Sequence, residues 1–326
     1  MRSIFVHEYL SGGGEMACEA EAAELLPMGL AMRDALLADL LRIPDLNVTC
    51  AVSARAGLPL AHPRLTATTA HAGEPAVAFV QRQARAHELA WIVAPESDGL
   101  LLAMHEAVGA PGWVGCDAAS LRTASSKTAT LLALRACGVP TPMDFMVASV
   151  APAGWRWIVK PDDGAGAMAT RVHAARDDAA ADLARRQAAG LSATAEPFVE
   201  GEALSISMLA GPGFVQPLAF NEQQIVIDGG GQLRYLGVRP NAIDRRTDPR
   251  ATRLHTLALD VQRALPGLRG FVGIDLVWHA ERGPVVIEVN PRLTCAYVSL
   301  SATLGRNLAE EILLLHGLPE VVDGAP

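Results

Sequence analysis

The chain is poor in aromatic residues and in lysine, and it carries no excess of positive charge. Phe, Trp and Tyr make up 5% of its 326 residues, and only Lys127 and Lys160 are lysines among 27 basic residues. The formal net charge of −8 argues against a nucleic-acid partner, because phosphate backbones are bound by basic surfaces. Half of the residues are hydrophobic, which is typical of a globular protein.

Paired cysteines and long apolar runs are also missing. The five cysteines are scattered and form no C-x-x-C pair, so nothing indicates a disulfide framework or a zinc site. No segment approaches the roughly 18 consecutive apolar residues that a membrane-spanning helix requires. Residues 1–14 lack the apolar stretch of a secretory signal. We therefore expect a cytoplasmic chain with no membrane partner.

Strand-like and helix-like segments alternate up to about residue 117. Strands are predicted over 3–7, 47–53 and 89–94, with helical patterns up to residue 41 and over 75–90. Such alternation is typical of a parallel sheet flanked by helices. We expect residues 1–117 to form an N-terminal α/β domain of Rossmann-like type.

The remainder of the chain has an α+β pattern. Closely spaced strands between helices favour an antiparallel sheet. We expect a small domain over 118–192 and a larger one over 193–326. The predicted helices cover 120–137, a segment after residue 173, 251–265 and 300–316, and the predicted strands cover 155–160, 170–173, 195–199, 204–209, 214–220, 223–227, 271–278 and 284–289.

Both lysines lie where a cation can contact a phosphate group. Lys127 is early in the predicted helix 120–137, and Lys160 ends an apolar strand just before the loop Gly164-Ala165-Gly166. Glycine lets successive backbone N–H groups approach an anion, and lysine adds a mobile positive charge. A plain turn with a solvated lysine is the alternative that this loop alone leaves open.

Two better-known nucleotide-binding loops are absent. Residues 125–128 resemble the end of a P-loop, but Leu121 and Ser126 occupy the positions of its glycines. The turn at 12–14 lacks the G-x-G-x-x-G spacing that follows the first strand of a dinucleotide-binding domain. An NAD-dependent oxidoreductase is therefore disfavoured.

A predicted hairpin near the C-terminus gathers three oxygen donors. Glu288 and Asn290 are two residues apart in one strand, so both point to the same face, which Asp275 reaches from the neighbouring strand. Two carboxylates and an amide oxygen are ligands that suit Mg²⁺. The alternative is a solvent-facing row of charges, which the concentration of donors beside Arg292 disfavours.

Taken in order along the chain, these features resemble the ATP-grasp superfamily. The resemblance covers about residues 118–316 and rests on the two lysines, the loop 164–166, the segment 196–201 and the Asp275…Glu288-Val-Asn290 set. It implies an ATP-grasp fold that follows a pre-ATP-grasp domain. It also implies ATP and Mg²⁺ as cofactors, with Mn²⁺ as the alternative ion.

The resemblance assigns a role to each matching residue. The metal ligands would be Asp275, Glu288 and Asn290, and the residues acting on the transferred groups would be Lys160, Asn290 and Arg292. Arg292 would contact substrate. Apart from the resemblance, Glu8 ends the first predicted strand, at the edge where ligands bind such sheets, so we expect it to contact substrate too. An acid near a helix N-terminus is the alternative for Glu8. The nucleotide would be bound by Lys127, Lys160, Gly164, Ala165, Gly166, Glu196, Pro197, Phe198, Val199, and Glu200 or Glu202.

Residues 8–14, 220–223 and 290–292 give a closer likeness to the archaeal tyramine–glutamate ligases of methanofuran synthesis and their bacterial relatives. This likeness implies that a carboxylate, of glutamate or a similar amino acid, is joined to an amine through an acyl phosphate. Gly273 stands where D-alanine ligases have an arginine, which argues against D-alanine ligation. Another ATP-grasp chemistry (peptide ligase or carboxylase) and a non-catalytic nucleotide-binding regulator stay open, as does a homodimer.

Overall fold

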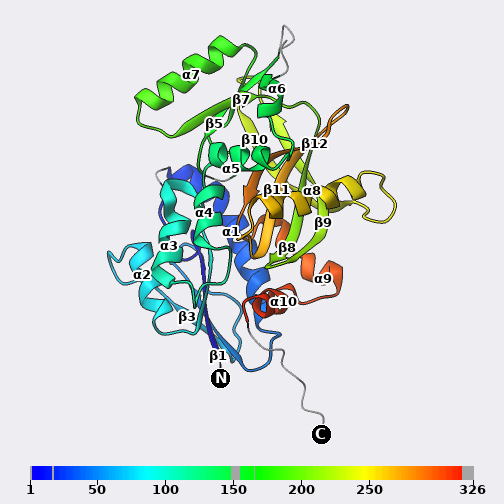
Figure 1. The fold of residues 1–326 in the computed structure, drawn as a ribbon. Coiled ribbons are helices and arrows are strands. Elements are labelled where there is room, and N and C mark those ends of the chain that lie inside the picture. Colours follow the sequence, from blue (N-terminus) through cyan, green and yellow to red (C-terminus); the bar gives the residue numbers. More distant parts are fainter. Residues whose placement is uncertain (1, 17, 148–154, 165, 318–326) are drawn as a thin grey trace.

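A four-stranded parallel sheet forms the N-terminal part of the molecule in a computed structural model, which describes residues 2–16, 18–147, 155–164 and 166–317. The strand order β3-β2-β1-β4 confirms the predicted parallel α/β arrangement (Figure 1). Strand β3 was not predicted, because it is a short, half-exposed edge strand. The elements are β1 (Arg2–Glu8), α1 (Glu19–Leu40), β2 (Leu46–Ala51), β3 (Leu65–Thr68), α2 (Ala76–Ala84), β4 (Leu89–Val93), η1 (Ser97–Gly99) and α3 (Leu100–Val108).

A small antiparallel sheet lies at the opposite end of the molecule, at the top of Figure 1. Its order is β6-β5-β7, and α7 packs against it through a cluster that contains Trp157, Val159 and Ala179. The elements of this part are α6 (Met143–Val147), β5 (Trp157–Pro161), β6 (Arg171–His173), α7 (Arg176–Ala188) and β7 (Ala193–Pro197).

The largest sheet has five antiparallel strands in the order β10-β9-β8-β11-β12. Helix α8 covers one face, where Ile206, Met208 and Ile274 share a buried core with Leu254 and Leu257. The opposite face carries polar side chains near its centre, among them Ser205, Asn221 and Asp275. The elements are β8 (Glu202–Gly211), β9 (Phe214–Ile227), β10 (Leu233–Ile243), α8 (Ala251–Ala264), β11 (Gly270–His279) and β12 (Gly283–Asn290).

Two segments that were predicted as single helices each form two shorter helices in the structure. The segment 120–137 is divided into α4 (Ala118–Ala124) and α5 (Lys127–Ala136), because the Ser126 side chain caps α5 by accepting a hydrogen bond from the Ala129 N–H at 3.0 Å. The segment 300–316 is divided into α9 (Leu300–Leu304) and α10 (Leu308–Leu315) at Gly305, whose φ of 65° ends the first helix.

The prediction of two separate strands over 214–220 and 223–227 was wrong. They form one strand, β9, because Asn221 and Glu222 stay in the ladder opposite Ser205 and Leu204. Strand β10 was not predicted, since its side chains are mostly polar or half-exposed and show no apolar alternation.

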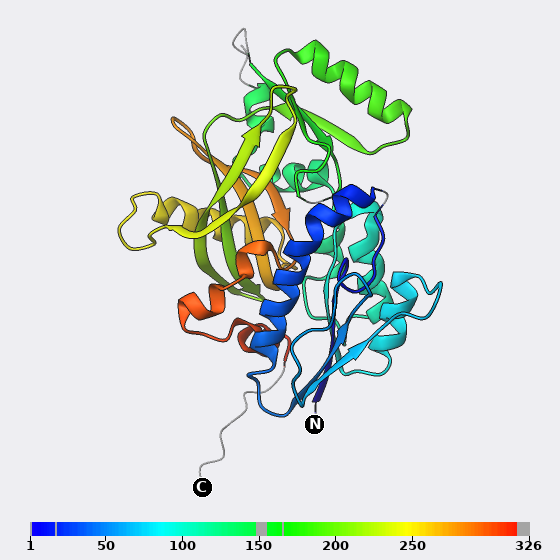
Figure 2. The ribbon, with the colours of Figure 1, turned by 180° about the vertical axis from the view of Figure 1, so that it is seen from behind.

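Contacts between distant segments join the three sheets. At the tip of the β9–β10 hairpin, the Gly231 carbonyl accepts from the Val172 N–H at 2.8 Å, and the Leu233 N–H donates to Thr170 at 2.9 Å. Helix α1 lies beside the C-terminal helices when the molecule is seen from behind (Figure 2). There the Tyr297 hydroxyl donates to Asp39 at 2.6 Å. Within the described ranges, no helix has both the length and the apolar character needed to cross a membrane.

Candidate active site

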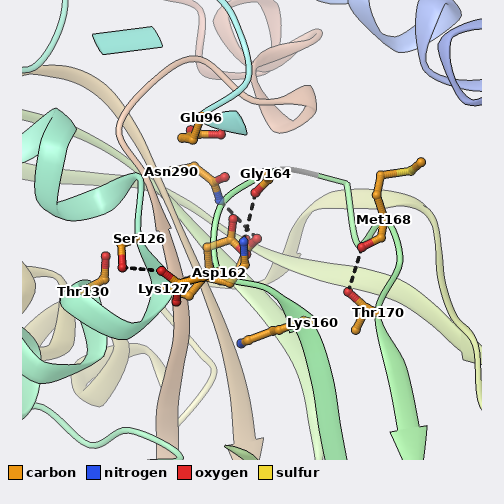
Figure 3. Close-up of polar contacts among 12 residues, drawn as sticks. Glu96, Ser126, Lys127, Thr130, Lys160, Asp162, Gly164, Met168, Thr170 and Asn290 are labelled. Atoms are coloured by element: carbon orange, nitrogen blue, oxygen red, sulfur yellow. Dashed lines mark hydrogen bonds and ion pairs between the residues drawn. The ribbon is translucent and has the colours of Figure 1, made fainter. Parts of the chain in front are cut away.

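Lys127 lies at the first position of α5 and points back toward the glycine-containing loop. Its side chain is buried, and Nζ donates to the Gly164 carbonyl at 3.0 Å. The same ammonium lies 3.6 Å from Glu288 Oε2. Lys127 therefore connects the loop after β5, through the contact with Gly164 drawn in Figure 3, with Glu288 of the β11–β12 hairpin.

Asp162, which the sequence did not predict as part of the site, ties this loop to the start of α5. Its carboxylate accepts from Ser126 Oγ at 2.6 Å and from the Thr128 N–H at 2.9 Å, and its carbonyl accepts from the Lys127 N–H at 2.7 Å. Burial raises the pKa of Asp162, but these hydrogen bonds outweigh burial and lower it overall. The capping Ser126 is a sequence signal, yet nothing in the sequence identifies the carboxylate it binds.

The loop itself depends on glycine. Gly164 has a φ of 98° and Gly166 a φ of 74°, values in the left-handed region that other residues rarely adopt. Ala165, predicted between them as a nucleotide contact, lies outside the described residues. The loop begins at Asp163, whose carboxylate accepts a hydrogen bond from the Asp98 N–H at 2.7 Å. The N-terminal part therefore contacts the loop directly.

Lys160 forms a buried ion pair with Glu196. Strands β5 and β7 are neighbours, and Nζ lies 2.6 Å from Glu196 Oε1. The Lys160 side chain is 4% exposed and the Glu196 side chain is 5% exposed. An ammonium has three N–H groups, so Lys160 keeps donors for a further anion while Glu196 balances its charge.

The segment after β7 places its two acidic side chains outside the site interior. The Phe198 N–H donates to the Arg156 carbonyl at 2.9 Å, and Pro197 and Val199 on either side of it are buried. Glu200 is exposed and accepts from Arg156 Nε at 2.9 Å. Glu202 is exposed too, and it accepts from Arg250 Nη1 at 2.6 Å. Both carboxylates are thus paired with arginines on the surface.

The three predicted metal ligands meet on the polar face of the large sheet. Asp275 lies opposite Glu288, and Asn290 lies opposite Gly273. Asn290 Nδ2 donates to Asp275 Oδ2 at 3.1 Å, and Gln223 Nε2 donates to Asp275 Oδ1 at 2.9 Å. The predicted convergence of these side chains is therefore present in the structure.

A β-bulge in β12 makes this convergence compatible with the core behind the sheet. Asp275 pairs with Glu288, whereas the next residue, Leu276, pairs with Val286, so Ile287 is an extra residue with no partner. Val286 and Val289 both join the core beneath α8, although they are three residues apart. A regular strand would put them on opposite faces, and the bulge restores the alternation that aims Glu288 at Asp275.

The electrostatics of this set fit a divalent cation. Burial and, next, the negative charge of Glu288 raise the pKa of Asp275 to about 7. A cation between the two carboxylates would relieve that repulsion, and oxygen donors suit Mg²⁺. Among the described residues there is no cluster of three or more His, Cys, Asp or Glu side chains that could hold a metal. The candidate is therefore two carboxylates assisted by an amide.

Arg292 lies at the far side of this set and is held by Glu96, a residue that the sequence did not predict. Nε and Nη2 of Arg292 donate to the two Glu96 oxygens at 2.8 and 2.9 Å. Burial lowers the pKa of Arg292, but the Glu96 carboxylate outweighs burial and raises it. An acid directly after a buried parallel strand is the signal that could have identified Glu96, because ligands bind at that edge of such sheets.

Glu8 is buried at the end of β1, but its carboxylate is used within its own turn. It accepts from the Ser11 N–H at 2.8 Å and from the Leu10 N–H at 3.3 Å. Burial raises the pKa of Glu8. A Cβ added at Gly29 of α1 would lie 2.6 Å from Glu8 Oε1, so the helix leaves room for the carboxylate only because glycine is there.

Direct contacts therefore link one group of predicted residues and leave others apart. The linked group runs from Gly164 through Lys127 to Glu288, and from Asp275 through Asn290 to Arg292. The Lys160–Glu196 pair, the exposed Glu200 and Glu202, and Glu8 lie outside this chain of contacts.

Two family models match the chain. The first, described as an ATP-grasp domain, matches residues 124–296, and the second, a pre ATP-grasp 3 domain, matches residues 46–121. Tyramine–L-glutamate ligase of Methanocaldococcus fervens is 32% identical over 105 residues. That match covers 32% of this chain and 32% of the relative, so it spans about a third of the relative's length.

Solved structures share the fold over nearly the whole chain. An ATP-grasp superfamily protein of Archaeoglobus fulgidus has a TM-score of 0.66 and 21% identity, covering 96% of this chain and 88% of its own. D-alanine–D-alanine ligase of Bacillus anthracis has a TM-score of 0.65 and 15% identity, covering 97% of each chain. At these identities the likeness shows the fold alone.

Proposed function

This chain belongs to the ATP-grasp domain family, and on that premise we propose that it is a ligase that uses ATP to join a carboxylate to an amine, releasing ADP and phosphate. The observation that carries the proposal is the continuous run of contacts from the loop at Gly164 through Lys127 to the Asp275–Glu288 pair. A glycine loop for phosphates and an oxygen-rich metal set are thereby held next to each other, as phosphoryl transfer requires.

We assign the nucleotide to the space between the small sheet and the large one. Lys127, Lys160 and the loop 164–166 bind phosphate oxygens, and the segment 196–199 contacts the adenine. Either Glu200 or Glu202 binds the ribose after leaving its arginine. The three domains are proposed at 1–117, 118–192 and 193–326, so that the nucleotide lies between the second and the third.

Asp275, Glu288 and Asn290 would hold Mg²⁺, with Mn²⁺ as the alternative, and such an ion neutralises phosphate charge when it is bound. The chain's own groups support the same step. Gln223 and Asn290 orient the Asp275 carboxylate through hydrogen bonds to its two oxygens. Lys127 lies beside Glu288, where its ammonium can stabilise the negative charge that shifts between phosphate groups during the transfer.

The reaction proceeds in two transfers. An oxygen of the substrate carboxylate attacks the γ-phosphorus, the bond to the β-phosphate oxygen breaks, and ADP leaves. The amine nitrogen then attacks the acyl carbon, loses a proton, and displaces phosphate. Arg292 donates hydrogen bonds to the oxygen that becomes negative in the second transfer. The loop 164–166 limits the access of water, which would hydrolyse the acyl phosphate.

For the substrates we propose glutamate, or a similar amino acid, as the carboxylate and an aromatic amine such as tyramine as the acceptor. The similarity to tyramine–L-glutamate ligase supports this choice, and it suggests a place in methanofuran-type cofactor synthesis. A peptide ligase or a carboxylase is the competing chemistry, because D-alanine–D-alanine ligase shares the same fold.

The test is a screen of substrate pairs that measures ADP release, with tyramine, tyrosine, glutamate and bicarbonate among the candidates. We expect ADP release with an amine and an amino-acid carboxylate, and its loss in Asp275→Asn. Stimulation by bicarbonate alone would favour a carboxylase. No binding of ATP in a calorimeter, with Mg²⁺ or Mn²⁺ present, would overturn the proposal.

A further inference from the structure

Glu96 and Arg292 form a buried ion pair between segments 196 residues apart in the sequence. Glu96 is 3% exposed and follows β4 at the carboxyl edge of the parallel sheet, whereas Arg292 follows β12 of the large sheet. The two parallel hydrogen bonds, at 2.8 and 2.9 Å, fix the plane of the guanidinium as well as its position. The orientation of Arg292 is thus set by the N-terminal part of the molecule.

The remaining donors of Arg292 face the candidate metal set and the chain next to it. Nη1 donates to the Leu293 carbonyl at 3.3 Å, and Nη2 lies 3.5 Å from Asn290 Oδ1. Of the five guanidinium N–H groups, one on Nη1 has no partner among the residues that the structure describes. That N–H is available to a bound molecule.

The segment that carries Glu96 also contacts the loop after β5. The Asp98 N–H donates to Asp163 Oδ2 at 2.7 Å, and Asp98 has a φ of 54°, in the left-handed region. A Cβ added at Gly164 would lie 3.1 Å from Ser97 Oγ. Figure 3 shows Glu96 close to Asn290, with Gly164 nearby. Residues 96–98 therefore contact both Arg292 and the start of the loop.

We propose that Glu96 is a positioning residue, which acts through Arg292 and makes that arginine a hydrogen-bond donor for the transfer step instead of a binding site for an anionic substrate. The inference rests on the proposed ligase function. An arginine neutralised by a buried carboxylate offers a donor without a net charge to attract a free carboxylate. Such a donor is worth most where negative charge develops during the reaction.

This assignment predicts opposite effects on binding and on turnover when the Glu96 charge is removed. In Glu96→Gln the positive charge of the guanidinium is no longer balanced by a carboxylate, and the guanidinium loses its fixed orientation. We expect kcat to fall by about tenfold or more, which is less than the roughly 10²-fold loss for removing a preorganised donor itself, because Arg292 is still present. The KM of the carboxylate substrate should stay the same or decrease, because the unpaired cation attracts it more strongly. The Kd of ATP should change by less than about twofold.

Glu96→Asp and Asp39→Asn serve as matched variants. Glu96→Asp keeps the charge one methylene further away, and it should recover part of the lost kcat. Asp39→Asn weakens another buried polar contact between the N-terminal part and the C-terminal segment, through Tyr297, and it lies away from the site. It should lower stability and leave kcat close to wild type. If Glu96→Gln changes kcat and KM no more than Asp39→Asn does, the inference is wrong.

A second readout separates this inference from the proposed function. If the wild-type protein releases no ADP with any substrate pair, the proposed function fails, but the coupling through residues 96–98 can still be measured. Glu96→Gln should then raise hydrogen exchange at the amides of residues 98, 290 and 292–294 more than Asp39→Asn does. Equal exchange in the two variants at equal stability would overturn the coupling.

Discussion

The two lysines differ in what balances their charge. Lys160 is paired with the buried Glu196 at 2.6 Å, whereas Lys127 donates to a backbone carbonyl and lies 3.6 Å from Glu288. Lys160 is therefore held in place by its own strand pair, and Lys127 lies beside a carboxylate that is also a proposed metal ligand. The ammonium of Lys127 is the one that a bound metal would displace or redirect.

Replacing Lys160 by alanine should lower turnover by at least about 10²-fold, the scale for removing one preorganised electrostatic group. The reason is the loss of a phosphate donor, while Glu196 is left as an unpaired buried charge. The measurement is ADP release at saturating ATP with a working substrate pair. Arg263→Ala, which removes an exposed positive charge from α8, is the control and should be silent. Nearly normal turnover in Lys160→Ala would contradict the role.

His7 is a buried polar residue whose protonation differs between the folded and the unfolded chain. It is fully buried in β1, its ring lies 5.9 Å from that of Phe79, and both ring nitrogens lack a hydrogen bond among the described residues. Burial lowers the pKa of His7 to about 4. The folded chain therefore keeps His7 neutral at pH values where the unfolded chain would protonate it.

Stability should consequently fall as the pH drops from about 6.5 to about 4. In that window the unfolded state binds a proton that the folded state does not, which favours unfolding, and the effect is complete below pH 4. Its size is about 3 kcal/mol for a difference of this magnitude. Urea unfolding of wild type and His7→Leu at pH 6.5 and 4.5 tests this. The same pH dependence in both proteins would show that other groups cause it.

Residue types and their spacing were enough to predict Asp275, Glu288 and Asn290, because one hairpin brings them together by local geometry. Glu96 and Asp162 were missed for the opposite reason. Their partners lie 196 and 36 residues away, and only tertiary packing makes those contacts. Lys127 was predicted from the scarcity of lysine and from the resemblance, since its partners are distant in the sequence. The roles of all these residues stay predictions.

At the scale of elements, the β9–β10 hairpin joins the large sheet to the small one. Its tip pairs with β6 through Gly231 and Leu233. Gly231 has a φ of 82°, and a Cβ there would overlap the Val172 carbonyl oxygen. A hairpin that reaches across in this way restricts how far the small sheet can move from the large one.

Gly231→Ala should loosen this connection. The added Cβ meets backbone, and the left-handed φ adds strain of about 1–3 kcal/mol. We expect weaker ATP binding, seen as a higher Kd in calorimetry, since the proposed nucleotide position depends on both sheets. Gly213→Ala has the same kind of φ, 68°, but nothing within 4 Å, so it controls for strain alone. Equal Kd values in the two variants would refute the connection.

The elements themselves were predicted best where the apolar pattern was strong. Strands β1, β4, β11 and β12 are almost fully buried and were expected at nearly their observed bounds. The features that were missed are those whose boundaries or pairing are set by polar contacts instead of an apolar pattern. Ser126 ends one helix and begins another, and β10 is an edge strand whose pairing with β9 supplies what its side chains do not.

At the scale of the whole molecule, a buried polar contact fastens α1 to the C-terminal segment. Asp39 accepts hydrogen bonds from the hydroxyl groups of Tyr297 and Ser301, and its carbonyl accepts from Asn307 Nδ2 at 3.1 Å. The residues concerned are about 260 positions apart, and Figure 2 shows α1 beside α10. The N-terminal part and the C-terminal segment are thus held together by buried hydrogen bonds.

Asp39→Asn should lower the free energy of unfolding by about 1–3 kcal/mol, because an amide accepts these buried hydroxyl donors less strongly than a carboxylate. Urea unfolding followed by circular dichroism measures the change. Glu24→Gln, an exposed change on the same helix, is the control and should have no effect. A stability equal to that of wild type would show that the contact does not fasten the two parts.

The bulge at Ile287 also has an evolutionary consequence. The extra residue sets which side of the strand every later side chain occupies, so the carboxylate at 288 and the amide at 290 depend on the count of residues after Gly283. A gain or loss of one residue elsewhere in 283–290 would turn these ligands inward and the core valines outward. Lineages descended from this sequence should therefore vary in length at the turn 280–282 and keep the length of 283–290 constant.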